Sequence, residues 1–201
     1  PIAMTTWVPT VAERGFLQIF PGNLALPFMQ AQVDAMSAAT PLGMLKFEQQ
    51  VTPLVDLAFG IVSGSLGETS GLLLLLGGVY LWLRRDLDWR IPVSILLTVI
   101  VFSACLGFFD AARFPTPLFS IFSGGLLLGA IYMATDPVTS PVTPRGAWIF
   151  GIGTGVLVML IRVFGGLPEG VMYAILLMNA ATPLINRYTQ PRVFGRGVDA
   201  K

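Results

Sequence analysis

An acid and two hydroxyl side chains recur every three residues in one early stretch of the chain, at Asp34, Ser37 and Thr40. Apolar residues recur at helical spacing between them, which predicts a helix over residues 26–39 with the acid and the serine on its polar face. Pro41 disfavours a helical conformation for the residue before it, so we expect this helix to end at Thr40 and to present the hydroxyl at an exposed corner. The simplest alternative is a short interfacial helix with a turn, since serine and threonine are common at helix ends.

A second group of polar side chains, Glu68, Thr69 and Ser70, directly precedes a long apolar run. Ser65 stands three residues before Glu68, the spacing of a capping box, so one interpretation is a helix start whose free amides are satisfied by these side chains. The other interpretation is a binding site, because a glycine-rich helix start exposes backbone amides that can hold an anion.

Asp136 lies in a Thr-Asp-Pro turn between two apolar runs. A carboxylate at a membrane edge is a candidate for handling cations, so Asp136 is our candidate for an ion pathway. Its structural alternative is an ordinary turn carboxylate. Thr143 and Pro144 follow shortly after and suit the cap and the first turn of the next helix.

The composition excludes several kinds of site. The chain has no histidine, which excludes His-based acid–base catalysis and His metal ligation within it. Its single cysteine, Cys105, cannot form an internal disulfide or a complete iron–sulfur ligand set, and we expect it to pack among apolar residues. The net charge of +1 and the scattered basic residues argue against a nucleic-acid partner.

The elements that position these residues are predicted to be membrane helices. Apolar residues make up 54% of the 201 residues, charged residues 11%, and the mean hydropathy is +0.76, which is too apolar for an ordinary soluble domain. We predict an all-α, polytopic integral membrane helix bundle, with a surface segment over residues 1–66, the bundle over 67–186 and a tail over 187–201. Five spans are expected near residues 67–83, 91–109, 118–134, 147–164 and 169–186. Their glycines suit close approach of helices.

The basic residues are divided unevenly between the two sides of the predicted bundle. One side has eight of them: Arg84, Arg85, Arg90, Arg145, Arg187, Arg192, Arg196 and Lys201. The other side has four: Arg14, Lys46, Arg113 and Arg162. Cations favour the cytoplasmic side, so we predict a cytoplasmic tail and an external Thr40, which in a bacterium means the periplasm. Because the chain opens at Pro1 without an initiator methionine, we also expect earlier helices of the protein to precede it.

Three stretches resemble one known family. Residues 34–40 read Asp-Ala-Met-Ser-Ala-Ala-Thr and resemble the flavinylation motif Asp-x-x-(Ser/Thr)-Gly-Ala-Thr of the RnfD and NqrB families, with Ala38 in the place of the usual glycine. Residues 64–70, Gly-Ser-Leu-Gly-Glu-Thr-Ser, are similar to a stretch that recurs in both families. Residues 134–139 read Ala-Thr-Asp-Pro-Val-Thr and closely resemble a family signature.

Two further features bear on the branch of the family. The continuation Pro-Val-Thr-Pro-Arg-Gly over residues 141–146 favours RnfD over NqrB. Residues 177–188 also look like RnfD, although relatives often have an acid where Asn186 stands. The resemblance thus extends from Thr40 to the tail.

The resemblance implies covalent FMN, joined to Thr40 through a phosphoester bond, with Asp34 and Ser37 as parts of the motif. It also implies a periplasmic flavin transferase, ApbE, that takes FMN from FAD, and a periplasmic flavoprotein partner, RnfG. Riboflavin among the helices, and contact of a flavin edge with Glu68, Thr69 and Ser70, are further expectations.

A phosphate on Thr40 would lie near a helix C-terminus, where the helix dipole disfavours anions, so we expect it to need a compensating cation. We expect Arg113 or Arg162 to approach the phosphate. The alternative is that each of these side chains extends to the outer lipid headgroups.

The function implied by the resemblance is that of a membrane subunit in an Rnf-type complex of the bacterial inner membrane. With the other Rnf subunits, such a complex couples ferredoxin and NAD redox chemistry to ion movement, so the chain would belong to a translocase without being catalytic alone. The nearest alternative is the NqrB subunit of a sodium-pumping NADH:quinone oxidoreductase. A secondary transporter and a scaffold bundle without cofactor are the alternatives from other classes.

Overall fold

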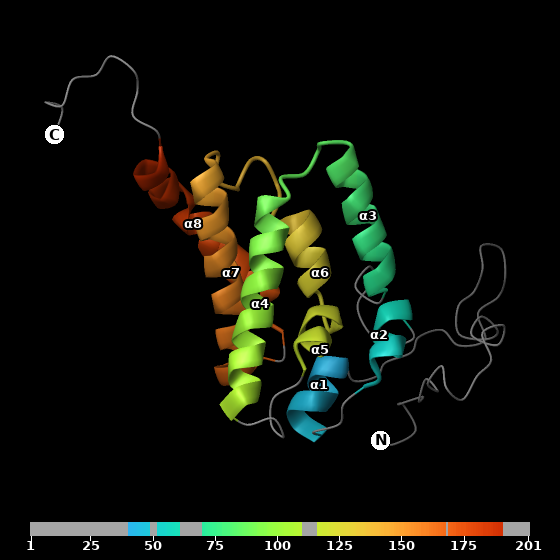
Figure 1. Cartoon of the computed structure of the whole chain (residues 1–201). Helices are drawn as coiled ribbons and strands as arrows, with labels where there is room; N and C mark the ends of the chain where they lie inside the picture. The colour runs from blue at the N-terminus through green and yellow to red at the C-terminus, as the bar shows by residue number, and fades with distance from the viewer. Residues whose placement is uncertain (1–39, 49–51, 61–69, 110–115, 168, 191–201) are drawn as a thin grey trace, which may run out of the picture.

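The computed structural model describes residues 40–48, 52–60, 70–109, 116–167 and 169–190, and these residues contain helices and turns but no strand. The longer helices stand side by side, with their ends gathered at two opposite ends of the bundle (Figure 1). In chain order the elements are α1 (Pro41–Gly43), the π-helix η4 (Met44–Glu48), α2 (Leu54–Phe59), α3 (Gly71–Leu83), α4 (Arg90–Phe109), α5 (Pro117–Phe122), α6 (Leu126–Leu128), the π-helix η5 (Gly129–Met133), α7 (Pro144–Phe164) and α8 (Val171–Thr189). The predicted all-α class is confirmed for this part of the chain.

Two helices in the described ranges are long and apolar enough to cross a membrane. They are α4, over 19 residues of its length, and α7, over 21 residues. Helix α3 is apolar but has 13 residues, and α8, which contains Pro183, is not among the candidates. All five predicted spans coincide with helical segments, but length and composition mark only these two as candidate membrane spans.

The predicted third span, residues 118–134, is not one continuous helix. Helix α5 ends at Phe122, a turn over residues 123–125 follows, and α6 then continues into η5. Gly124 in this turn has a φ of +68°, a left-handed conformation that glycine adopts without strain. This conformation cannot continue an α-helix, however apolar the flanking residues are, so the predicted third span is divided into two helical pieces.

Glycines on α7 allow its two neighbouring helices to approach closely. A Cβ added at Gly151 would lie 2.8 Å from the Cβ of Ser94 on α4, and one at Gly155 would lie 2.7 Å from the Cβ of Thr98. On the side of α8, a Cβ at Gly153 would lie 2.6 Å from Cε of Met178. The prediction that these glycines serve close helix packing is therefore confirmed.

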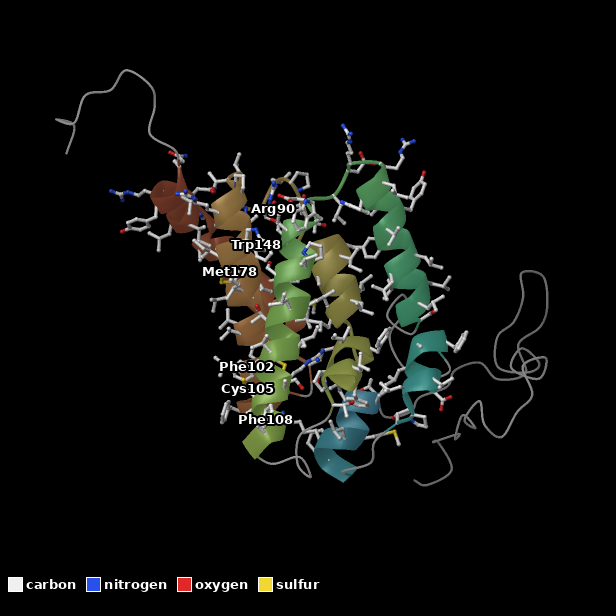
Figure 2. The ribbon with its side chains drawn as sticks, in the orientation of Figure 1. Arg90, Phe102, Cys105, Phe108, Trp148 and Met178 are labelled. Atoms are coloured by element: carbon white, nitrogen blue, oxygen red, sulfur yellow. The ribbon has the colours of Figure 1, made fainter. Side chains whose placement is uncertain are left out.

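A few polar side chains are buried within the apolar core of this bundle, and apolar side chains also cover its outside. Buried hydroxyls bond back to their own helices: Ser94 Oγ donates to Ile91 O at 2.8 Å, and Thr154 Oγ1 donates to Phe150 O at 2.8 Å. Exposed apolar side chains on α4 are Val93, Leu97, Ile100, Val101 and Phe108. Cys105 is also exposed on α4 (Figure 2), so the expected packing among apolar residues is not provided by the described part of the chain. An apolar outer face around buried hydroxyls is the arrangement expected in lipid.

The basic residues are segregated along the bundle as predicted, within the part of the chain that the structure describes. The ends of α3 and α8 and the starts of α4 and α7 share one end of the bundle (Figure 1), which carries Arg84, Arg85, Arg90, Arg145 and Arg187. We call it the cation-rich end. Lys46 and Arg162 lie at the opposite, cation-poor end with α1.

Aromatic rings accompany the cations at the cation-rich end. Trp89 and Trp148 pack edge to face with their ring centroids 6.2 Å apart, and the guanidinium of Arg90 lies 5.6 Å from the Trp89 centroid. Figure 2 shows Arg90 and Trp148 at the same end of α4 and α7. Tryptophan beside arginine is typical of a membrane interface.

We expect Gly151→Ala to destabilise the protein by about 1–3 kcal/mol, because the added methyl overpacks the contact with Ser94. Gly107→Ala on α4 is the matched control, since a Cβ there meets nothing within 4 Å. Alanine also has the better helix propensity by up to ~1 kcal/mol, so the control should be neutral or slightly stabilised. Thermal unfolding of the detergent-solubilised protein measures both, and equal unfolding midpoints would contradict the packing described here.

Candidate functional site

Thr40 begins a helix. Its backbone is extended, with φ −68° and ψ 154°, and its Oγ1 accepts a hydrogen bond from Gly43 N at 3.2 Å. Pro41 fills the first helical position, where its missing N–H costs nothing. The expectation that Thr40 stands at a helix C-terminus overlooked this role, because Thr-Pro suits the start of a helix as well as its end. Residues 26–39, the predicted preceding helix, lie outside the described residues.

Two other threonines have the same local geometry. Thr116 precedes Pro117 and its Oγ1 accepts from Phe119 N at 3.4 Å, while Thr143 precedes Pro144 and its Oγ1 accepts from Gly146 N at 3.0 Å. The predicted cap at Thr143 is thereby confirmed. Since cap geometry is shared, what distinguishes Thr40 is the Asp-Ala-Met-Ser-Ala-Ala sequence before it.

The helical segment that follows Thr40 is docked on the bundle by an apolar contact and a charged one. Leu42, 7% exposed, packs with Leu57 of α2 and Phe119 of α5. The ammonium of Lys46 donates to three carbonyls at the end of α7, those of Arg162 (3.2 Å), Leu167 (2.9 Å) and Gly165. Lys46 therefore caps the C-terminus of α7 and fixes residues 40–48, which we call the Thr40 segment, to it.

Arg162 is directed at the break between α5 and α6. Its Nη1 donates to Ser120 O at 2.6 Å and its Nη2 donates to Ser123 O at 3.1 Å. The carboxylate of Glu169 accepts from Gly125 N on the other side of the break and interacts electrostatically with Arg162. Both terminal nitrogens of Arg162 are thus bonded to backbone carbonyls of the bundle.

Several predicted site residues fall outside the described residues: Asp34, Ser37, Glu68, Thr69 and Arg113. Ser70 is described and caps α3, with its Oγ accepting from Leu73 N at 3.5 Å. Ser70 thus has a capping role, and the predicted capping box of Ser65 and Glu68 lies outside the described residues. Among the described residues no group of three His, Cys, Asp or Glu side chains could hold a metal ion.

Asp136 lies at the cation-rich end, away from Thr40. Its Oδ1 accepts from Val138 N at 3.3 Å and its Oδ2 accepts from Thr139 Oγ1 at 3.2 Å, so it has the role of a turn carboxylate. The same loop is tied to α8, because Asn186 Oδ1 accepts from Val142 N at 3.2 Å. Relatives often have an acid where Asn186 stands, and a carboxylate oxygen could accept the same hydrogen bond. The amide oxygen of Asn186 therefore keeps this contact.

Sequence reasoning missed Glu169 and Asp56. Glu169 accepts a hydrogen bond from Gly125 N at the break between α5 and α6. Asp56 is a 2% exposed carboxylate on α2, next to Leu57 in the cluster beneath Leu42. The available signal was the rarity of acids, since the whole chain has 11 of them and a buried acid among apolar segments usually has a specific role. Lys46 was predicted only as an outer cation.

Comparison with known proteins identifies the family. The chain matches the NQR2, RnfD, RnfE family over residues 1–195. It belongs to this family. Family membership and the apolar outer faces of α4 and α7 together place the chain in a membrane.

The relatives in this family include the D subunits of ion-translocating complexes. The chain is 42% identical to the D subunit of the Na⁺-translocating ferredoxin:NAD⁺ oxidoreductase complex of Acetobacterium woodii, over 93% of this chain and 58% of the relative. It is 42% identical to the D subunit of the proton-translocating ferredoxin:NAD⁺ oxidoreductase complex of Clostridium ljungdahlii, over 97% and 56%. The D subunit of the ion-translocating oxidoreductase complex of Stutzerimonas stutzeri is 42% identical over 100% and 60%. The chain therefore spans somewhat more than half the length of these relatives.

We expect Gly124→Ala to destabilise the region around Thr40 by about 1–3 kcal/mol, because alanine is strained at this positive φ. The added Cβ would also lie 2.6 Å from Leu42 Cδ1 and against the Glu169 carboxylate. Gly166→Ala is the control, as a Cβ there meets nothing within 4 Å. Hydrogen exchange over residues 40–48 should rise in the first variant alone, and unchanged exchange would show that the glycine is not needed.

Proposed function

We propose that this chain is part of a membrane subunit of an Rnf-type complex and carries FMN covalently on Thr40. The complex would couple ferredoxin and NAD redox chemistry to ion translocation, and this subunit would relay electrons without being catalytic alone. Membership of the NQR2, RnfD, RnfE family and 42% identity to the D subunits of two ferredoxin:NAD⁺ oxidoreductase complexes support the proposal.

The observation that carries the proposal is the position of the Thr40 hydroxyl. It ends the Asp34–Thr40 motif, it is half-buried, and it starts a helical segment docked at the cation-poor end of the bundle. A phosphodiester there would lie at the amide end of the helix, where the dipole favours an anion. The need for a compensating cation is smaller than at a helix C-terminus. Arg113 stays the candidate for that cation.

Attachment at Thr40 would be a transfer from FAD. The threonine oxygen would form a bond to the phosphorus on the FMN side of the pyrophosphate, the pyrophosphate bond would break, AMP would leave and the hydroxyl proton would be lost. A periplasmic transferase of the ApbE kind requires this hydroxyl to face the periplasm, which the scarcity of cations at this end favours. Asp34 and Ser37 would be the motif residues that this enzyme recognises.

Bound FMN would supply one-electron transfer, and the residues of this chain would set its surroundings. The cluster of Leu42, Leu57 and Phe119 beneath the attachment point keeps water from that side. We assign the electron-transfer partner to the periplasmic flavoprotein RnfG, with the other Rnf subunits and inner-membrane lipids around the bundle. Riboflavin among the helices, flavin contact at Glu68, Thr69 and Ser70, and an ion pathway at Asp136 belong to the same proposal.

The alternatives are less well supported. An NqrB-type subunit fits the family, but residues 141–146 favour the Rnf branch, and the three relatives compared with this chain are D subunits. A transporter without flavin would suit the broken helix, since discontinuous helices often bind substrates. Here, however, Arg162 and Glu169 bond to the polar groups of the break.

In-gel flavin fluorescence of the denatured full-length protein, co-expressed with the transferase, tests the proposal. We expect fluorescence from the wild type and none from Thr40→Ala, because covalent flavin survives denaturation. Thr116→Ala is the matched control, since it removes the same kind of cap, worth ~1 kcal/mol, at the same end of the bundle. It should fluoresce like the wild type.

Two results would count against this assignment. A fluorescent Thr40→Ala variant would place the flavin on another residue. A dark wild type, with the transferase active on a second substrate, would make Ala38 the decisive departure from the motif and favour a subunit without covalent flavin.

A further inference from the structure

The break between α5 and α6 leaves backbone polar groups outside any helix. The last carbonyls of α5 lack partners within that helix, and Gly125 N lies at the start of α6. In an apolar surrounding each such group is costly to leave without a partner. The chain needs donors for the carbonyl side of the break and an acceptor for the amide side.

Arg162 and Glu169 meet these two needs with opposite charges. The guanidinium donates to Ser120 O at 2.6 Å and to Ser123 O at 3.1 Å, and the Glu169 carboxylate accepts from Gly125 N. The two side chains also attract each other electrostatically, so each reduces the cost of burying the other.

Lys46 connects the Thr40 segment to the same residue. Its ammonium donates to the backbone carbonyl of Arg162 at 3.2 Å, while the Arg162 side chain holds the break. Lys46 lies in η4, which follows α1 directly, so the connection runs from Thr40 through one short helical segment. Leu42 of that segment touches Gly124 in the break itself.

We infer that Lys46, Arg162 and Glu169 form a charged clamp that holds the Thr40 segment against the break in the third span and so sets the surroundings of a group attached to Thr40. The three are positioning residues, since they act through the backbone and through the Thr40 segment. The part that concerns an attached flavin rests on the proposed function. The clamp itself is defined by contacts within the chain.

The geometry of the guanidinium also defines a sensitive test. Arg162 uses two terminal nitrogens in a fixed planar fork, and its Nε and the hydroxyl of Ser123 are buried without a hydrogen-bond partner among the described residues. The cavity left by Arg162→Gly would therefore present two carbonyls and a carboxylate arranged for a planar cation. Free guanidinium should fill it, whereas sodium at equal ionic strength should not.

The experiment measures hydrogen exchange over residues 40–48 in the full-length protein within its complex. Lys46→Met, Glu169→Gln and Arg162→Gly should each raise exchange at Gly43 and Met44 roughly tenfold, the change that about 1.4 kcal/mol produces. Lys46→Arg should retain most of the protection, because arginine can also donate to several carbonyls. Arg145→Gln, at the opposite end of the bundle, should leave exchange unchanged, and millimolar guanidinium should restore protection in Arg162→Gly.

The midpoint potential of the attached flavin is the second readout. It should shift in Lys46→Met and Glu169→Gln while in-gel fluorescence shows the flavin still attached, and it should return in Lys46→Arg. Unchanged exchange and potential in Lys46→Met and Glu169→Gln would overturn the clamp, whether or not Arg162→Gly folds. A wild type without flavin would refute the proposed function, and the exchange measurement would still decide the clamp.

Discussion

The structure depends on how the backbone polar groups at the break between α5 and α6 are satisfied. A helix interrupted among apolar side chains is stable only if other groups replace its missing hydrogen bonds. Arg162 and Glu169 replace them, and because they come from the end of α7 and the loop after it, they also hold α7 to the broken segment. The fold at the cation-poor end is thus organised around one pair of opposite charges.

In the rest of the bundle, close packing holds the helices together. Glycines on α7 bring α4 and α8 within contact, and serine and threonine hydroxyls at these interfaces bond to their own helices, so they place no unsatisfied group in the interior. Large apolar side chains both fill the core, as Phe150 does, and cover the outer face, as Phe108 does. A bundle of this kind is stabilised by shape and by van der Waals contact, since lipid removes most of the hydrophobic difference between inside and outside.

Much of this fold was predictable from the sequence, because composition and charge act over whole segments. The all-α class, the helical segments and the separation of cations between the two ends follow from apolar runs and from the placement of lysine and arginine. The break was not predictable in the same way, since it depends on one positive φ at Gly124 and on charged partners more than 35 residues away in the chain. The capping role of Thr40 was missed for a local reason, because Thr-Pro fits both ends of a helix, and the predicted helix before it lies outside the described residues.

The candidate residues for electron transfer and for ion handling lie at opposite ends of the bundle. Thr40 is docked at the cation-poor end, whereas Asp136 lies in a turn at the cation-rich end. The broken segment of α5, α6 and η5 runs between them: α5 packs beneath Leu42, and η5 leads into the loop that holds Asp136. A segment made of two short helices and a π-helix has weaker internal hydrogen bonding than a continuous α-helix, and so it can be displaced at lower cost. Relatives named for sodium and for proton translocation match this chain equally, at 42% identity, so the degree of identity does not distinguish between these two kinds of relative.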